Sequence, residues 1–254
     1  QQRYEKAREE EYSIQEFLDM CKQDKSCYAS AAERLLTAIG EPEMIDTSTN
    51  PRLSRLFSNR VVARYPAFKD FYGMEEAIEQ IVSYLKHSAQ GLEEKKQILY
   101  LLGPVGGGKS SLAEKLKSLM QKVPIYRIKG SPVNDHPFCL FDIDEDGEIL
   151  EKEYGIPRRY LRPIMSPWVA KRLHEFGGDI TKFKVEKVNP SILDQIAIAK
   201  TEPGDDNNQD ISSLVGKVDI RMLEHFAQDD ADAYSYSGAL CKANQGMMEF
   251  VEMF

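Results

Sequence analysis

The clearest chemistry in the chain belongs to the eight residues from Gly103 to Ser110. They read Gly-Pro-Val-Gly-Gly-Gly-Lys-Ser, which matches the P-loop pattern of proteins that bind nucleoside triphosphates. Backbone N–H groups of such a loop surround phosphate oxygens. We expect Lys109 to reach the β- and γ-phosphates and the Ser110 hydroxyl to bind Mg²⁺. The predicted phosphate-binding residues are Gly103, Pro104, Val105, Gly106, Gly107, Gly108, Lys109, Ser110 and Ser111.

Two elements must hold this loop in place. The apolar run 97–102 predicts a short buried strand, and residues 111–120 carry apolar side chains at helical spacing. Strand, loop and helix together are the context that the P-loop needs. The alternative is a glycine-rich turn without a ligand, but the complete context favours a nucleotide site.

A second nucleotide motif lies near the end of the chain. Residues 237–252 resemble the G-A-L-x-x-A-N-x-G segment that leads into the Walker B strand of several AAA+ families. In those families an Asp holds the Mg²⁺ shell and the next Glu polarises the attacking water. Aligned on Gly246, the catalytic Glu falls on Glu252 and the Asp on Val251. Because Val251 departs from the pattern, either Glu249 or another residue assists the metal, or hydrolysis is weak. An ordinary core strand with one charge is the alternative.

Taken together, the motifs resemble one family, the PrkA-type bacterial serine protein kinases. The resemblance covers essentially the whole chain. Its matching stretches are residues 31–36, 40–42, 51–57, 71–76, 102–111 and 244–253. It implies an N-terminal AAA+ ATPase region, ATP with Mg²⁺ as cofactors, protein substrates phosphorylated on serine, and a role in bacterial stress and starvation responses. It also implies a kinase-like C-terminal region beyond Phe254.

The resemblance adds a place for the base of the nucleotide. From Glu75 onward, apolar side chains recur at helical spacing. In AAA+ ATPases, a helix and its preceding turn in this position often supply the adenine pocket. Phe71 and Tyr72 would then form an aromatic wall, and Gly73 would allow close approach of the backbone. Alternatively, both aromatic side chains belong to the core.

The same reading predicts an α/β fold of the P-loop NTPase (AAA+-like) class, a parallel sheet flanked by helices. We expect a helical region and linker at 1–58 and an incomplete ATPase domain at 59–254. Strand 123–128 follows the P-loop helix, and a large insertion at about 130–205 separates it from the Walker B-like strand, since one crossover helix needs far fewer residues.

One motif inside the insertion suggests a different ligand. From Asp142 to Glu153, carboxylates fall at positions one, three, five and twelve and Gly147 at position six, as in an EF-hand calcium loop. Prolines before this stretch and at Pro157 interrupt the helices that an EF-hand requires. We therefore favour a solvated acidic turn over a calcium site.

Composition limits the partners. The net charge of −8 argues against general nucleic-acid or anionic-membrane binding through bulk electrostatics, and no apolar run approaches the roughly 20 residues needed to span a bilayer. Four scattered cysteines without a C-x-x-C pair indicate reduced thiols and a cytoplasmic location. The chain starts without Met and stops in an apolar run, so we expect a fragment of a longer protein.

Three functions stay open at this point. The chain is the nucleotide-binding part of a serine protein kinase, a remodelling or proteolytic AAA+ motor, or a nucleotide-gated scaffold, with a ring-shaped homo-oligomer of the AAA+ type as a possible assembly. No kinase catalytic-loop pattern H-R-D-x-x-x-x-N and no D-F-G occurs in the sequence. The motifs on view therefore belong to the ATPase machinery.

Overall fold

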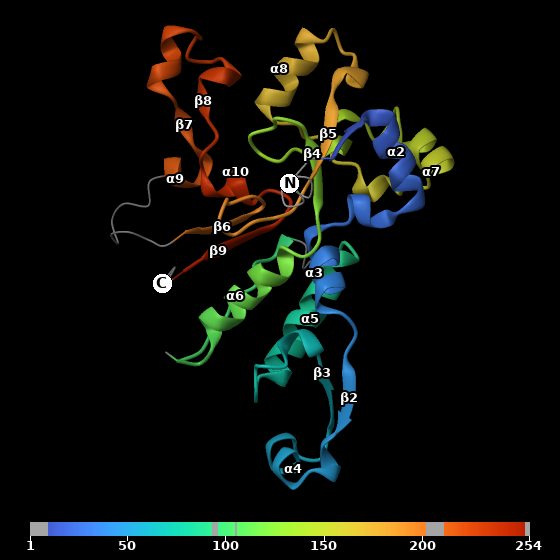
Figure 1. Cartoon of the computed structure of the whole chain (residues 1–254), viewed down its shortest axis with the longest axis vertical. Helices are drawn as coiled ribbons and strands as arrows, with labels where there is room; N and C mark the ends of the chain where they lie inside the picture. Colours follow the sequence, from blue (N-terminus) through green and yellow to red (C-terminus); the bar gives the residue numbers. More distant parts are fainter. Residues whose placement is uncertain (1–9, 93–95, 105, 202–210, 252–254) are drawn as a thin grey trace, which may run out of the picture. The chain divides into compact units, whose positions relative to one another are not determined.

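The computed structural model describes residues 10–92, 96–104, 106–201 and 211–251. The chain divides into two compact units (Figure 1). Unit 1 comprises residues 1–28 together with 124–254, and unit 2 comprises residues 29–123. Each unit is described by itself below.

Unit 1 is built on a three-stranded antiparallel sheet. Its strands lie in the order β1 (Glu10–Ser13), β5 (Lys184–Val188) and β4 (Ile125–Ile128). The strand predicted at 123–128 is thereby confirmed as β4. Val185 and Glu186 of the central strand are buried, so this sheet has apolar and charged groups in its interior.

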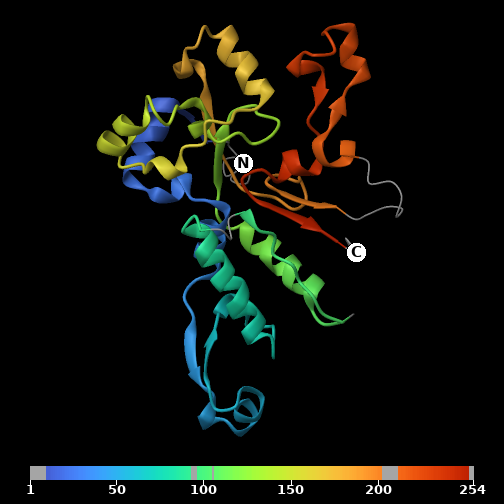
Figure 2. The same ribbon diagram turned by 180° about the vertical axis from the view of Figure 1, so that it is seen from behind.

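Helices and short 3-10 turns cover this sheet. They are α2 (Ile14–Gln23), η1 (Lys25–Tyr28), η5 (Pro137–Leu140), α7 (Gly147–Tyr154), η6 (Arg158–Tyr160), α8 (Pro167–Glu175) and η7 (Ile180–Lys182). α2 begins with a capping box, in which Ser13 and Glu16 each accept a hydrogen bond from the backbone of the other. In both ribbon views α2 and α7 lie side by side (Figure 1, Figure 2). The core between helices and sheet includes the fully buried Phe17 and Phe138.

The rest of unit 1 contains a parallel strand pair, β6 (Ile198–Thr201) with β9 (Met247–Phe250). Between these strands the chain forms the following elements: α9 (Ile211–Val215), β7 (Lys217–Val218), η8 (Ile220–Glu224), η9 (Ala231–Ala233), β8 (Tyr234–Ser235) and α10 (Ala239–Ala243). Lys171 of α8 contacts Asp230 at 2.7 Å and Asp232 at 2.6 Å. These ion pairs attach the segment around η9 to α8.

Unit 2 consists of helices and a short strand pair. Its elements are α3 (Ala31–Ile39), β2 (Glu43–Asp46), η2 (Thr47–Thr49), α4 (Pro51–Phe57), β3 (Val61–Arg64), η3 (Pro66–Phe68), α5 (Glu75–Ala89) and α6 (Lys109–Met120). α3 packs against both α5 and α6. β2 and β3 pair antiparallel and lead to α4 at the far end of the pair (Figure 2). The helices predicted before and after the P-loop are confirmed as α5 and α6.

The buried strand predicted at 97–102 is wrong in this structure. These residues form no strand, and the side chains of Ile98, Tyr100 and Leu102 are 77%, 58% and 80% exposed. The physical reason is that a strand needs a neighbour to bond its backbone. The strands described in unit 2, β2 and β3, bond to each other, so this apolar run has no ladder to join within its unit.

The predicted domain boundary near residue 58 does not coincide with the boundaries between the two compact units. β2 and β3 pair across this point, with Asp46 opposite Val61, and α3 packs on α5. The compact units instead meet at Tyr28/Ala29 and Val123/Pro124. The division into 1–58 and 59–254 stays a prediction.

Two further findings concern the sequence-based expectations on location. All four cysteines are free thiols. Over the described ranges, no helix combines the length and the hydropathy that crossing a membrane demands.

Candidate nucleotide site

The P-loop of unit 2 is shaped by its glycines. Gly106 and Gly108 both have φ of +79°, a backbone conformation that glycine adopts without steric cost. Gly107 donates its N–H to the Pro104 carbonyl at 3.1 Å, and a Cβ at Gly107 would lie 3.0 Å from that oxygen. Gly108 then becomes the N-cap of α6, which starts at Lys109. The sequence forms the loop because only glycine fits these turns.

The loop delivers a cation and a helix N-terminus to one place. The Lys109 ammonium donates to the Gly103 carbonyl, and to that of Pro104 at 2.8 Å, so the charge stays against the loop. Ser110 and Ser111 are exposed in the first turn of α6. The first N–H groups of a helix have no partner within the helix and carry its positive dipole end. The arrangement therefore suits an anion such as a polyphosphate. Val105 lies outside the described residues.

The helix that follows the loop is anchored by its apolar face. Leu112, Ala113, Leu116 and Leu119 are buried, and α6 packs on α3. This burial fixes the direction of the helix axis, and with it the place where the N–H groups of the first turn point.

The turn before α5 lies against the P-loop. A Cβ at Gly108 would be 3.1 Å from Sδ of Met74, so the turn that carries Phe71, Tyr72 and Gly73 touches the loop through Met74. Within unit 2 the structure thus brings together two segments that the sequence predicted to share a site. Gly73 has φ of +76°, which explains the glycine in this tight turn.

The predicted aromatic wall is only partly formed. Phe71 is half-buried and packs edge-on against Phe68, with ring centroids 5.9 Å apart. Tyr72, by contrast, is 80% exposed. Phe71 borders a hollow of about 220 Å³, open space included, whose lining also contains Arg64, Tyr65, Phe68, Glu75 and Ile78. Oε2 of Glu75 is buried there and has no hydrogen-bond partner among the described residues.

The second motif lies in unit 1, where Gly246 directly precedes β9. A Cβ at Gly246 would lie 1.6 Å from the Ala197 carbonyl oxygen, so only glycine allows this approach. β9 runs parallel to β6, with Met247 opposite Ile198 and Glu249 opposite Lys200. Glu249 is half-buried in mid-strand. Glu252, the predicted catalytic residue, lies outside the described residues.

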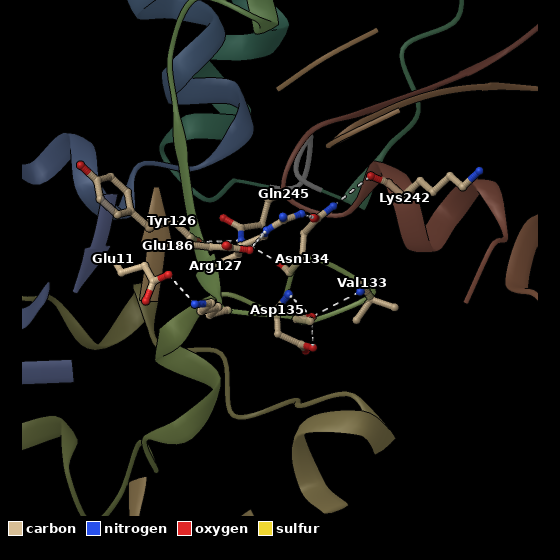
Figure 3. Close-up of polar contacts among 11 residues, drawn as sticks. Glu11, Tyr126, Arg127, Val133, Asn134, Asp135, Glu186, Lys242 and Gln245 are labelled. Atoms are coloured by element: carbon tan, nitrogen blue, oxygen red, sulfur yellow. Dashed lines mark hydrogen bonds and ion pairs between the residues drawn. The ribbon is translucent and has the colours of Figure 1, made fainter. Parts of the chain in front are cut away.

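A network of polar side chains holds the turn before β9, and we call it the turn clamp: Arg127, Asn134, Glu186, Asn244 and Gln245. Figure 3 shows Arg127, Asn134, Glu186 and Gln245 converging between β4 and the end of α10. Gln245 Nε2 donates to the carbonyls of Tyr126 at 2.9 Å and Asn134 at 2.7 Å. Asn244 Nδ2 donates to the Val133 carbonyl at 2.8 Å. In the sequence, Asn244 and Gln245 were recognised only as positions of the second nucleotide motif. Arg127, Asn134 and Glu186 were not identified.

The clamp continues into the sheet. Arg127 Nη1 donates to Asn134 Oδ1 at 2.7 Å, and Nε of the same guanidinium contacts Glu186 Oε1 at 2.6 Å. Asn134 and Glu186 are only 4% and 3% exposed. The only available sequence signal was the placement of Arg127 and Glu186 in otherwise apolar strands, where a charge needs a partner.

Tyr126 also borders a pair of buried thiols. A hydrogen bond from Cys21, with one from Tyr126, lowers the pKa of Cys27 to about 7. The same bond to Cys27, together with burial, raises the pKa of Cys21. Burial, then the bond to Cys27, raises the pKa of the Tyr126 hydroxyl.

The calcium-loop pattern folds as a helix-starting turn. Asp142 Oδ1 accepts the N–H groups of Asp144 at 2.7 Å and Glu145 at 3.1 Å, and Asp146 Oδ2 accepts the N–H of Asp142 at 2.8 Å. α7 begins at Gly147, where an EF-hand loop would still be turning. Among the described residues, no group of three or more His, Cys, Asp or Glu side chains could hold a metal. These carboxylates bind backbone instead.

Comparisons with known proteins identify relatives of this chain. The family model described as PrkA AAA domain matches residues 12–254. A protein of Escherichia coli K12 named serine/threonine kinase YeaG is 79% identical over all of this chain and 40% of its own length. A Bacillus subtilis protein named ATP-dependent protease PrkA is 33% identical over 98% of this chain and 40% of its own length. No solved structure matches.

The chain thus spans about 40% of the length of the curated relatives it matches. AAA domains are P-loop NTPases with an α/β fold, in keeping with the P-loop at the start of α6 and with the mixture of helices and strands. On the match over nearly its entire length, this chain belongs to the PrkA AAA domain family.

Proposed function

We propose that this chain is the ATP-binding region of a protein serine kinase that acts in bacterial stress and starvation signalling. One observation carries the nucleotide site: the Lys109 ammonium lies on the P-loop carbonyls at the start of α6, and Met74 brings the turn 71–74 against Gly108. The names of the Escherichia coli relatives support the kinase assignment.

The residues fit ATP and Mg²⁺. Lys109 and the first-turn N–H groups of α6 would hold the phosphates, and Ser110 would bind the metal. Mg²⁺ held there would supply positive charge that offsets the charge developing on the phosphates. Phe71 and Gly73 would line the base. Glu252 would polarise the attacking water, with Glu249, three residues earlier, as the second candidate.

The wider organisation follows from the same proposal. We place the P-loop and β9 in one AAA+-like α/β domain with a parallel sheet, and the parallel pairing of β6 and β9 supports this. Residues of about 130–205 would form an insertion that carries α7 and α8. The partners would be protein substrates in the cytoplasm and further copies in an AAA+-type ring, while nucleic acid is disfavoured by the net charge of −8.

A second function has its own support. The Bacillus subtilis relative is named an ATP-dependent protease, which fits a proteolytic AAA+ motor. A nucleotide-gated scaffold is the third possibility, because a P-loop alone binds nucleotide without defining what hydrolysis drives.

One experiment separates the three. The full-length protein that contains this chain is incubated with γ-labelled ATP and candidate protein substrates, beside its Lys109→Ala variant. Label on a substrate serine that disappears in the variant establishes the kinase. Free phosphate with substrate cleavage establishes the motor, and a nucleotide-dependent change in oligomer size without either product establishes the scaffold.

A further inference from the structure

The turn clamp has no role in the chemistry described so far, although its side chains are closely bonded to one another and to the backbone. We propose that Gln245 and Asn134 are positioning residues for ATP hydrolysis: they fix the turn before β9 and so the register in which this strand presents the residues that follow it. The inference rests on the proposed function, in which Glu252 comes two positions after the end of the described strand.

Gln245 is the centre of the clamp. Its side-chain amide supplies two hydrogens, and both are used, one on the Tyr126 carbonyl at 2.9 Å and one on the Asn134 carbonyl at 2.7 Å. Tyr126 belongs to β4, and Asn134 lies in the loop after β4. A single side chain therefore connects the turn before β9 to two points of the three-stranded sheet.

The side chain of Asn134 in turn forms a hydrogen bond to the segment that precedes the turn. Its Nδ2 donates to the Lys242 carbonyl at 3.1 Å, in α10 just before the turn. Arg127 donates to Asn134 Oδ1. The oxygen of the Asn134 amide therefore faces Arg127, and its nitrogen faces α10. The buried Glu186 holds the Arg127 guanidinium in turn. Because each amide has one possible orientation, the network allows a single geometry of the turn.

The backbone of the clamp is strained, which indicates that its geometry is imposed. Asn134 and Gln245 have φ of +53° and +66°, as does Ala197, opposite Gly246, at +56°. Non-glycine residues keep this conformation only where the surrounding structure holds them, and such residues concentrate at functional sites.

The strand register depends on this turn. The N–H of Met247 donates to the Ala197 carbonyl at 2.8 Å, and the N–H of Val251 donates to the Thr201 carbonyl at 3.0 Å. A slip of β9 by one residue would turn every side chain of the strand to the other face. The clamp sets the first of these bonds, and therefore decides which face later side chains of the strand occupy.

The test uses the full-length protein with Gln245→Met, which keeps the size of the side chain and removes both donors. We expect the Kd for ATP to stay within about twofold and kcat for hydrolysis to fall about 10- to 100-fold, as for a misplacement near 1 Å. Gln245→Lys, which restores a donor to the two carbonyls, should recover most of kcat. Gln15→Met is the matched control, because Gln15 also donates a side-chain hydrogen bond, to Tyr154 at 3.0 Å, in the same unit.

A second readout is independent of turnover. Hydrogen exchange at the Met247 and Val251 amides should accelerate in Gln245→Met and stay slow in Gln15→Met, since exchange reports local opening of these bonds. If Gln245→Met does not fold, Asn134→Asp takes its place: it keeps the acceptor for Arg127 and loses the donor to the Lys242 carbonyl.

The outcomes separate the inference from the proposed function. If a folded clamp variant keeps wild-type kcat while Glu252→Gln abolishes turnover, the positioning role is overturned and the proposed function stands. If Glu252→Gln keeps wild-type turnover, the assignment of Glu252 fails. Faster exchange at β9 together with a fall in kcat in the clamp variants, and neither change in Gln15→Met, supports the inference.

Discussion

The P-loop and the turn clamp solve a similar problem in different ways. Each is a short turn that starts a regular element, α6 in one case and β9 in the other. The P-loop obtains its left-handed residues from glycine, and its residues Pro104, Gly107 and Ser110 are exposed. The turn before β9 holds Gln245 in the same conformation with partly buried side-chain hydrogen bonds.

The difference shows what each turn contributes. A loop that binds phosphate must leave its N–H groups available, so its shape has to come from glycines, which adopt positive φ without steric cost. A turn that positions a strand is instead stabilised by hydrogen bonds from its side chains to the surrounding structure. Changes in the P-loop should therefore alter ligand binding with little effect on folding, and changes in the clamp should do the reverse.

The largest effect is expected at Gly246. Gly246→Ala should destabilise the protein by about 4 kcal/mol or more, in the range reserved for severe steric conflicts, because the new Cβ would meet the Ala197 carbonyl at 1.6 Å. In the P-loop, the Cβ added by Gly106→Ala would meet no neighbouring atom, so only the φ of +79° opposes the change. We expect this variant to lose about 1 kcal/mol of unfolding free energy. Urea unfolding of both variants measures the contrast, and equal losses would contradict it.

The next largest effect is expected at the ion pair within the clamp, between Arg127 and Glu186. Arg127→Met leaves Glu186, 3% exposed, without its guanidinium, and breaking a buried pair on one side costs about 3–5 kcal/mol. The double change Arg127→Met with Glu186→Leu should regain most of that loss, because neither charge then remains. Lys152→Met, which removes an exposed pair with Glu148, serves as the control and should leave the unfolding midpoint unchanged. A single variant as stable as the control would show that the pair contributes little.

On the P-loop side, Lys109→Ala should weaken ATP binding about 100-fold, roughly 2.7 kcal/mol, because the loop loses the ammonium that it holds at its carbonyls. Its free energy of unfolding should change by less than about 0.5 kcal/mol, as for most surface changes. Isothermal titration calorimetry measures the affinity. Lys115→Ala, on the same helix, is the control that should bind normally, and wild-type affinity in Lys109→Ala would refute the site.

For calcium at the acidic turn that begins at Asp142, we expect no binding. Titration of the protein with calcium to millimolar concentration should give no binding heat, because Asp142 and Asp146 already accept backbone N–H groups at the start of α7. Saturable heat that disappears in Asp142→Asn would overturn this account of the acidic turn.

The local features were predictable from the sequence. The P-loop glycines, the helices α5 and α6, and the strand β4 follow from turn chemistry and apolar periodicity, which depend on neighbours in the chain. The contact of Met74 with Gly108 needed only the motif order, since both segments flank one site in related ATPases.

What sequence reasoning could not supply depends on distant partners. An apolar run such as 97–102 predicts a strand, but a strand exists only where another backbone bonds to it. The clamp joins Arg127, Glu186 and Gln245, which no sequence spacing connects. The acidic run from Asp142 fits two structures equally well by composition, and the choice between metal and backbone is made by the helix that starts at Gly147.

The discontinuous make-up of unit 1 has a consequence for its synthesis. Glu10 of β1 contacts Lys187 of β5, 177 positions later, and all of unit 2 is made in between. At roughly 5–20 residues per second, β1 and α2 wait roughly 10–35 s for their partner strand. Phe17, buried in the finished protein against Phe138, lacks this cover until residue 138 has been made, so α2 exposes an apolar side chain to chaperones for part of that interval. The sheet that contains β1 is thus completed only after all of unit 2 has been made.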